Sequence, residues 1–202
     1  MKLLGLLKKI PIDLGQGNLR ETTKGKLIAQ ALVPKTKAGR TALDIGCREG
    51  YQTIYLQKKG YHVTSIDIEK IIPECIVMNV DKKLKFKDNS FDLIWCSEVI
   101  EHLKNPAFSI SEFRRVLKPG GRMILTTPNS YFWLVKLAYL LLNLTPKKMQ
   151  RQDHKHYFNI KQIKKLFPQA RIFGFFPYFV LKLKINKSVG LLSPTFVIVD
   201  KK

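Results

Sequence analysis

The chain has 202 residues, with 36 lysines and arginines against 15 acidic residues and a formal net charge of +21. This length favours one domain with additions, and a 45% share of hydrophobic residues excludes a wholly disordered chain. The basic excess predicts an anionic partner, such as nucleic acid, a phospholipid surface or a phosphorylated substrate.

Cysteine content and hydropathy predict the cellular setting. Cys47, Cys75 and Cys96 are widely spaced and form neither a disulfide framework nor a paired metal-binding motif. No uncharged apolar run reaches the ~18 residues needed to cross a bilayer, and the first ten residues lack a signal-peptide cleavage site. We therefore predict a cytoplasmic protein, with peripheral contact to an anionic membrane as an open alternative.

The basic charge is concentrated at both ends of the chain. Residues 1–40 carry a net charge of +7, residues 41–130 carry +2 and residues 131–202 carry +12. An anionic substrate or surface is therefore expected to meet the ends rather than the middle. The predicted organisation is a pair of basic helices at 1–40, a cofactor-binding core at 41–130, a lid or acceptor segment at 131–170, and closing strands of the same domain at 171–202.

In chain order, the first predicted element is a short basic amphipathic helix at 1–10 that ends before Pro11. A loop at 12–20 and a helix at 27–32 follow. From residue 41 strands and helices alternate, which predicts a doubly wound, mostly parallel α/β sheet with helices on both faces. The expected strands are 42–45, 61–67, 75–80, 91–97 and 123–127, and the expected helices are 51–59, a weak one around 71–72, and 107–117.

After residue 128 the alternation stops. We expect an apolar helix at 131–144, a basic loop at 145–157 and a basic helix at 159–167. Two further strands, at 171–183 and 195–199, are expected to close the sheet as an antiparallel pair. These bring the predicted sheet to seven strands.

The chemistry-bearing motif, DIGCREG, ends the first predicted strand at residues 44–50. Gly46 permits a tight turn and Gly50 a close approach of the backbone at the following helix. Asp67 ends the second strand, where a carboxylate can accept both hydroxyl hydrogens of a ribose. A dinucleotide fingerprint would need glycine at positions 46, 48 and 51, and this chain has only the first. The pattern favours a nucleoside cofactor other than a dinucleotide.

Four segments carry a further pattern, in this order: LDIGCREG at 43–50, VTSIDIE at 63–69, FKDNSFDLIWCSEVIEHL at 86–103 and RRVLKPGGRMILTTPN at 114–129. Together they resemble the class I S-adenosylmethionine-dependent methyltransferases, in particular the small-molecule group described as type 11. The resemblance implies a Rossmann-like fold, S-adenosyl-L-methionine as cofactor, and methyl transfer to oxygen or nitrogen, less often carbon, of a small or lipid-linked acceptor.

The resemblance also implies which residues hold the cofactor. The first-strand turn would contact its methionine part, the acid that ends the second strand its ribose, and the residues that follow its adenine. Arg48 departs from the family, which usually has glycine there; its side chain could crowd the turn, pair with the cofactor carboxylate or point to solvent. The cofactor-binding candidates are Asp44, Gly46, Cys47, Arg48, Gly50, Asp67, Ile68, Asp81 and Ser97.

Three histidines are candidates for a general base. Methyl transfer mainly requires a correctly held nucleophile, and an oxygen or nitrogen acceptor also has to lose a proton. His102 follows the fourth strand, and His154 and His156 lie in the segment after the fifth; local packing or a solvated loop is the alternative for each. Asp153 with the last two histidines offers too few ligands for a metal, so we predict no metal site.

The apolar and basic stretch after residue 130 has two interpretations. Helix 131–144 could be a lid buried on the sheet, or it could enter a membrane interface while the following cations meet anionic lipid. Ubiquinone-pathway O-methyltransferases resemble the chain here in position and composition. An RNA methyltransferase is a further alternative, disfavoured because no Pro-Pro-Tyr motif follows the fourth strand. A non-catalytic protein whose site Arg48 has compromised is another, and the oligomeric state stays open.

Overall fold

The computed structural model describes residues 23–36, 39–151, 153–176 and 183–202. The predicted helix at 1–10 and loop at 12–20 lie outside these residues. The strands are β1 (Arg40–Ile45), β2 (Tyr61–Asp67), β3 (Cys75–Val77), β4 (Phe91–Ser97), β5 (Leu117–Pro128), β6 (Arg171–Phe175), β7 (Lys184–Ile185) and β8 (Thr195–Lys201). The helices are α2 (Lys24–Ala31), α3 (Tyr51–Lys58), α4 (Pro106–Val116), α5 (Trp133–Leu142), α6 (Pro146–Met149), α7 (Ile160–Leu166), α8 (Val189–Leu192) and the 3-10 helix η1 (Ile100–His102).

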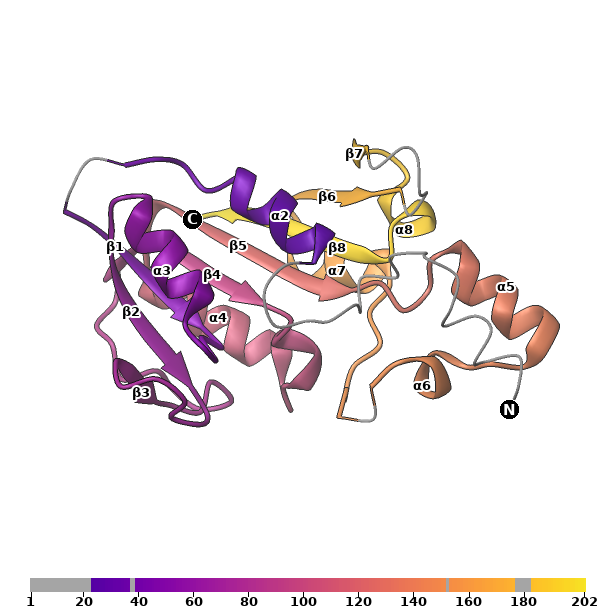
Figure 1. Cartoon of the computed structure of the whole chain (residues 1–202), viewed down its shortest axis with the longest axis horizontal. Coiled ribbons are helices and arrows are strands. Elements are labelled where there is room, and N and C mark those ends of the chain that lie inside the picture. The colour runs from indigo at the N-terminus through magenta and orange to yellow at the C-terminus, as the bar shows by residue number, and fades with distance from the viewer. Residues whose placement is uncertain (1–22, 37–38, 152, 177–182) are drawn as a thin grey trace.

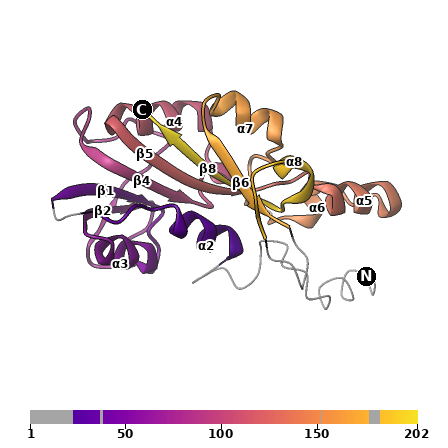
Figure 2. The same ribbon diagram turned by 90° about the horizontal axis from the view of Figure 1, so that it is seen from above.

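The strands form one sheet in the order β3-β2-β1-β4-β5-β8-β6-β7 (Figure 1). Strands β1 to β5 pair in parallel, whereas β8 pairs antiparallel with both β5 and β6. Helices α2 and α3 lie on one face of the sheet, and α4 and α7 lie on the other (Figure 2). The predicted doubly wound, mostly parallel α/β architecture is therefore confirmed.

The sheet has eight strands rather than the predicted seven. The stretch expected as one strand from 171 to 183 ends at Phe175, and the short β7 pairs beside it through Gly174 with Ile185 and Phe175 with Lys184. At the edge of a sheet, a second strand needs only one partner. The strand predicted at 171–183 is therefore shorter than expected, with residues 177–182 outside the described part of the chain, and β7 begins just after its predicted end.

Three other local predictions differ from the structure. The weak helix around 71–72 is absent, because Pro73 follows at once and only a single turn forms, with Cys75 N donating to Ile72 O at 3.1 Å. In the predicted basic loop, α6 forms at Pro146, a residue suited to the first turn of a helix. Strand β3 also ends at Val77, three residues before the predicted end.

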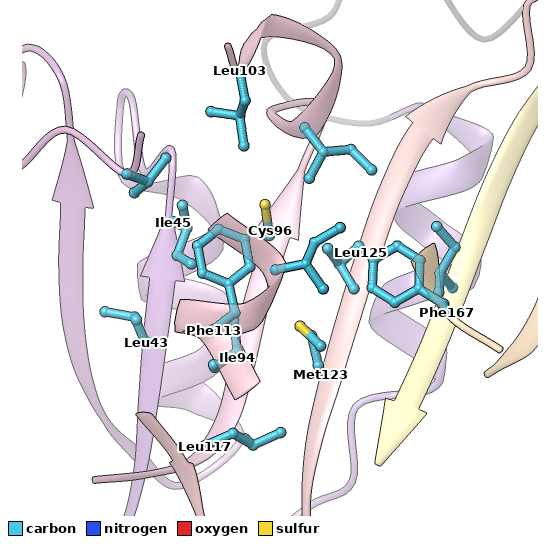
Figure 3. Close-up of a cluster of buried hydrophobic side chains, with 14 of the residues drawn as sticks. Leu43, Ile45, Ile94, Cys96, Leu103, Phe113, Leu117, Met123, Leu125 and Phe167 are labelled. Atoms are coloured by element: carbon cyan, nitrogen blue, oxygen red, sulfur yellow. The ribbon is translucent and has the colours of Figure 1, made fainter. Parts of the chain in front are cut away.

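The core lies on both faces of the sheet, which is why β4 is almost continuously apolar. Toward α4, Leu43 and Ile45 of β1 pack with Ile94 of β4, Phe113 of α4 and Leu125 of β5 (Figure 3). The alternate residues of the same strands are buried with side chains from α2 and α3 on the opposite face. Because the sheet is packed on both faces, the carboxyl ends of its strands form a rigid platform for a site.

Candidate functional site

The turn after β1 is built on two glycines with left-handed backbone. Gly46 has φ +77° and Gly50 has φ +79°, and Gly50 is the N-cap of α3. A Cβ on Gly46 would lie 2.5 Å from Cγ2 of Val99, closer than real carbon atoms approach. Gly46 N donates to Ile66 O of β2 at 2.8 Å, which ties the turn to the neighbouring strand. The turn therefore requires glycine both for its dihedral angles and for space.

Asp67 ends β2 beside this turn and organises it through backbone hydrogen bonds. Its Oδ2 accepts from Arg48 N at 3.0 Å and its Oδ1 from Ile68 N at 2.7 Å. Oδ1 also accepts a longer bond from Glu69 N at 3.4 Å. Because each carboxylate oxygen has two lone pairs, it is Oδ2 that can accept a further hydrogen bond from a ligand. The Asp67 carboxylate thus lies at the predicted position and retains capacity for ribose hydroxyls.

Arg48 also has left-handed backbone, with φ +47°. This conformation costs a non-glycine residue roughly 1–2 kcal/mol, which explains why the resembling family usually has glycine here. The Arg48 residue is exposed, whereas the neighbouring Cys47 is buried. This exposure is compatible with a guanidinium that points to solvent and with one that pairs with the cofactor carboxylate, and both stay predictions.

Asp44 is a buried carboxylate with one oxygen left free. Its Oδ2 accepts from Thr53 Oγ1 at 2.7 Å, and that hydroxyl also bonds Ser65 Oγ at 2.8 Å. Its Oδ1 is buried and has no hydrogen-bond partner among the described residues. Burial raises the Asp44 pKa from its ordinary value of 3.8 to about 6. A donor or cation from a ligand would complete this site, so the residues present fit a positively charged cofactor.

The thiols of the site are structural. Cys47, Cys75 and Cys96 are all free and buried, as the absence of a disulfide pattern predicted. Burial is the main cause that raises the pKa of the Cys47 and Cys96 thiols. Cys47 and Cys96 therefore stay protonated, and all three buried cysteines act as small packing residues.

The remaining cofactor candidates lie at the same edge of the sheet. Ile68 directly follows β2 and is 66% exposed, so an apolar surface is available there. Asp81 Oδ1 accepts from Lys104 N at 2.8 Å and supports the turn that precedes α4. Ser97 ends β4 and exchanges a 2.8 Å hydrogen bond with Thr126 Oγ1 of β5.

A second cluster forms where η1 meets the loop after α6. The backbone oxygen of Glu101 accepts from the backbone N–H groups of residues 155 and 156, at 2.9 and 3.0 Å. These bonds bring His154 against His102, with ring centroids 4.8 Å apart in an edge-to-face arrangement. His156 lies outside the pair and stacks on Phe158 at 5.7 Å. Of the three candidate histidines, the structure thus brings together two.

Two glutamates that were not counted as candidate residues belong to this cluster. Glu101 is 1% exposed, its Oε2 accepts from Thr127 Oγ1 at 3.0 Å, and burial followed by the charge of Glu98 raises its pKa well above the ordinary value. Glu98 Oε1 accepts from Thr126 Oγ1 at 2.7 Å, and burial raises its pKa to about 7. The signal in the sequence was their three-residue spacing directly after β4.

The two clustered histidines are held as neutral imidazoles. Burial lowers the His102 pKa, and it lowers the His154 pKa to about 4. His102 Nδ1 lies 3.2 Å from Asp153 O, and His154 Nδ1 lies 3.3 Å from Gln150 Oε1. Since both neighbouring oxygens are acceptors, each Nδ1 carries the hydrogen. Each Nε2 therefore keeps its lone pair, which can accept a proton or bind a metal.

Comparison with known sequences adds relatives to this geometry. The chain is 30% identical over 128 residues to a protein of Dechloromonas aromatica named ubiquinone biosynthesis O-methyltransferase. The aligned region covers 54% of this chain and 55% of that relative. A protein of Alkalilimnicola ehrlichii with the same name is 29% identical over 127 residues, and that alignment covers 54% of this chain and 51% of the relative. The chain thus spans about half the length of the curated relatives it matches.

Solved structures support the fold. A SAM dependent methyltransferase from Archaeoglobus fulgidus superposes with a TM-score of 0.63 at 20% identity, covering 88% of this chain and 94% of its own. An S-adenosylmethionine dependent methyltransferase from Mesorhizobium loti gives 0.64 at 15% identity, covering 89% and 98%. At such identities the likeness concerns the fold alone. A family model described as a methyltransferase domain matches residues 18–171, well over half of the chain, and this protein therefore belongs to that family.

Proposed function

We propose that the protein is an S-adenosyl-L-methionine-dependent methyltransferase acting on an oxygen or nitrogen of a small or lipid-linked acceptor. The observation that supports this most strongly is the buried Oδ1 of Asp44, which lies beside the glycine turn and Asp67 and has no hydrogen-bond partner within the described part of the chain. All three lie at the carboxyl ends of the adjacent parallel strands β1 and β2, where open α/β sheets bind ligands. The names of the curated relatives agree with this activity.

Each part of the site would have its own role. The cofactor, when bound, supplies the activated methyl group. Asp67 would hold the ribose hydroxyls, Asp44 would face the positive charge, and the backbone of the glycine turn would lie against the methionine part. Ile68, with Asp81 and Ser97, would line the rest of the cofactor cradle. His102 and His154 are neutral and would offer Nε2 as a hydrogen-bond acceptor that orients the acceptor group. The same burial that keeps them neutral makes both weaker proton acceptors than a free imidazole.

Asp67→Ala tests the cofactor cradle. Loss of charge-assisted hydrogen bonds costs about 1–3 kcal/mol, so we expect the dissociation constant for S-adenosylmethionine to rise roughly 10- to 100-fold in isothermal calorimetry. Asp88→Ala is the control, because Asp88 is an exposed carboxylate in the loop before β4, at the opposite edge of the parallel strands. Equal affinity of the two variants would show that the ribose is held elsewhere. No heat with the wild-type protein at millimolar cofactor would favour the non-catalytic alternative.

We propose further that α5 docks on an anionic membrane surface. The lid interpretation expects this helix to be buried, yet Val135 is its only fully buried residue, while Leu140 is 79% and Leu141 67% exposed. Among the described residues no helix is long and apolar enough to cross a membrane. Helix α5 projects from the end of the molecule, away from the sheet (Figures 1 and 2). The cations that follow it, Lys147, Lys148, Arg151 and Lys155, are all exposed.

This arrangement supports a lipid surface rather than a nucleic acid. Exposed leucines beside lysines match an interface that has an acyl layer below anionic headgroups, whereas an RNA backbone would use only the cations. A helix lying in the interface would also hold the adjacent loop, and with it His154, close to a lipid-linked acceptor. The strongly basic ends of the chain add long-range attraction to such a surface.

Leu140→Glu tests the membrane contact. A leucine side chain that enters the acyl layer contributes about 1.5–3 kcal/mol to membrane binding, and glutamate would lose this contribution. We therefore expect the affinity for phosphatidylglycerol vesicles, measured by cosedimentation, to fall at least about tenfold. Leu27→Glu on α2, where the leucine is 46% exposed, is the matched control and should bind like the wild-type protein. Equal loss in both variants would contradict docking through α5. Tighter binding to single-stranded RNA than to vesicles at the same salt concentration would favour the RNA alternative.

A further inference from the structure

Among the described residues, one group of three side chains could hold a metal ion: Glu101, His102 and His154. Each offers one ligand atom, and these atoms all lie within 4.8 Å of one another. Glu101 and His102 belong to η1 and His154 to the loop after α6, so the group joins segments about fifty residues apart in the chain. The backbone bonds from residues 155 and 156 to Glu101 O hold the two segments together.

The free oxygen of Glu101 points to a missing ligand. Glu101 is 1% exposed, and Thr127 Oγ1 occupies its Oε2, but its Oε1 is buried and has no hydrogen-bond partner among the described residues. That oxygen lies 3.9 Å from His102 Nε2. A buried carboxylate oxygen without a donor is costly, because it has lost water and gained nothing. A cation between Oε1 and the imidazoles would compensate for this loss.

The histidines are also held as metal-binding histidines usually are. His102 Nδ1 is directed at the backbone oxygen of Asp153, and His154 Nδ1 at the side-chain oxygen of Gln150. Gln150 is itself fixed, since its Oε1 accepts from Ser130 Oγ at 3.0 Å. Such outer contacts determine the tautomer and leave the Nε2 lone pair free for a metal. The structure therefore supplies both the ligands and the groups that orient them.

We propose that Glu101, His102 and His154 bind one divalent transition-metal cation. One carboxylate with two imidazoles suits Mn²⁺, Fe²⁺, Co²⁺ or Zn²⁺ better than Ca²⁺ or Mg²⁺, which prefer oxygen ligands alone. Two ligand atoms that each lie ~2.1 Å from a tetrahedral metal ion are about 3.4 Å from each other. The ligand atoms here lie within 4.8 Å of one another, so the side chains have to approach by about an ångström when the ion binds.

Three protein ligands leave at least one coordination position for water or an acceptor oxygen. A hydroxyl bound there would lose its proton more easily, because the cation stabilises the resulting oxyanion. This consequence rests on the proposed methyltransferase function, whereas binding of the cation does not. The two are therefore tested separately.

Titration with Co²⁺ alone, on the full chain without cofactor, tests the site. We expect about one equivalent to bind with visible d–d absorption, and Glu101→Gln and His154→Ala to weaken binding at least about tenfold. His156→Ala is the matched control, because this histidine is two residues away but stacks on Phe158 outside the group. Its affinity should stay within about twofold of the wild-type protein.

Absence of the absorption band at millimolar Co²⁺, or equal losses in the variants at 154 and 156, would overturn the proposal. Circular dichroism checks that each variant folds, and if His154→Ala does not, Glu101→Gln and His102→Gln decide the outcome. Calorimetry with S-adenosylmethionine on metal-free protein separates the two proposals. Cofactor binding without Co²⁺ binding would refute only the metal site, and Co²⁺ binding without cofactor binding would refute only the proposed function.

Discussion

Gly46→Val is expected to destabilise the protein by about 3 kcal/mol or more and to abolish detectable cofactor binding. A left-handed backbone costs a non-glycine residue roughly 1–2 kcal/mol, and a side chain forced into a filled space typically costs another ~1–3 kcal/mol. At this position φ is +77° and a Cβ would lie 2.5 Å from Val99 Cγ2. Chemical denaturation gives the free energy of unfolding, and calorimetry gives the affinity for S-adenosylmethionine.

Gly120→Val is the matched control for this substitution. Gly120 has nearly the same dihedral, φ +75°, but nothing lies within 4 Å of the Cβ that a substitution would add. It therefore incurs the backbone cost without the collision, and it lies at the amino end of β5, away from the turn. We expect the control to lose only the smaller, backbone share of stability and to keep cofactor binding. Equal destabilisation by both variants would show that Val99 moves aside.

Asp44→Asn is expected to raise stability above pH 6 while weakening cofactor binding. Burial raises the Asp44 pKa from 3.8 to about 6, so the folded state binds the proton more tightly than the unfolded chain does. The resulting stability is fully present below pH ~4 and is lost as the pH rises through 6, by about 3 kcal/mol at ~1.36 kcal/mol per pKa unit. Asparagine keeps an oxygen for Thr53 but carries no charge, so the variant should lack this loss.

Denaturation of both proteins between pH 4 and pH 8 measures this effect. We expect equal stabilities near pH 4 and a gap of about 2–3 kcal/mol in favour of the variant at pH 8. The exposed carboxylate of Asp88, changed to asparagine, should leave the profile unaltered. Parallel profiles for Asp44→Asn and the wild-type protein would mean that the buried carboxylate is compensated when charged. A gain in stability with a loss in affinity would identify Asp44 as a residue retained for binding.

Local patterns in the sequence were sufficient for most of the fold. Continuous apolar runs such as FDLIWCS predict strands covered on both faces, and the glycine turn after β1 is visible as a motif because its dihedral angles exclude most side chains. Predictions failed where the outcome depends on neighbours rather than on the residue pattern. The strand β6 ends at Phe175, and the sheet gains the short edge strand β7 at Lys184–Ile185, which no strand prediction covered; the helix at 71–72 did not form beside Pro73.

The sequence by itself determined the parallel sheet, the turn at residues 44–50 and the acid at its edge, because each depends on residues close together in the chain. Only the tertiary structure decided that α5 is exposed and that His154 lies against His102 while His156 does not. It also decided that Glu101 is buried and that its Oε1 has no hydrogen-bond partner among the residues the structure describes. The histidine pair and its cluster with Glu101 arise from hydrogen bonds and packing between segments about fifty residues apart, and no local pattern encodes which of two nearby histidines such contacts will select.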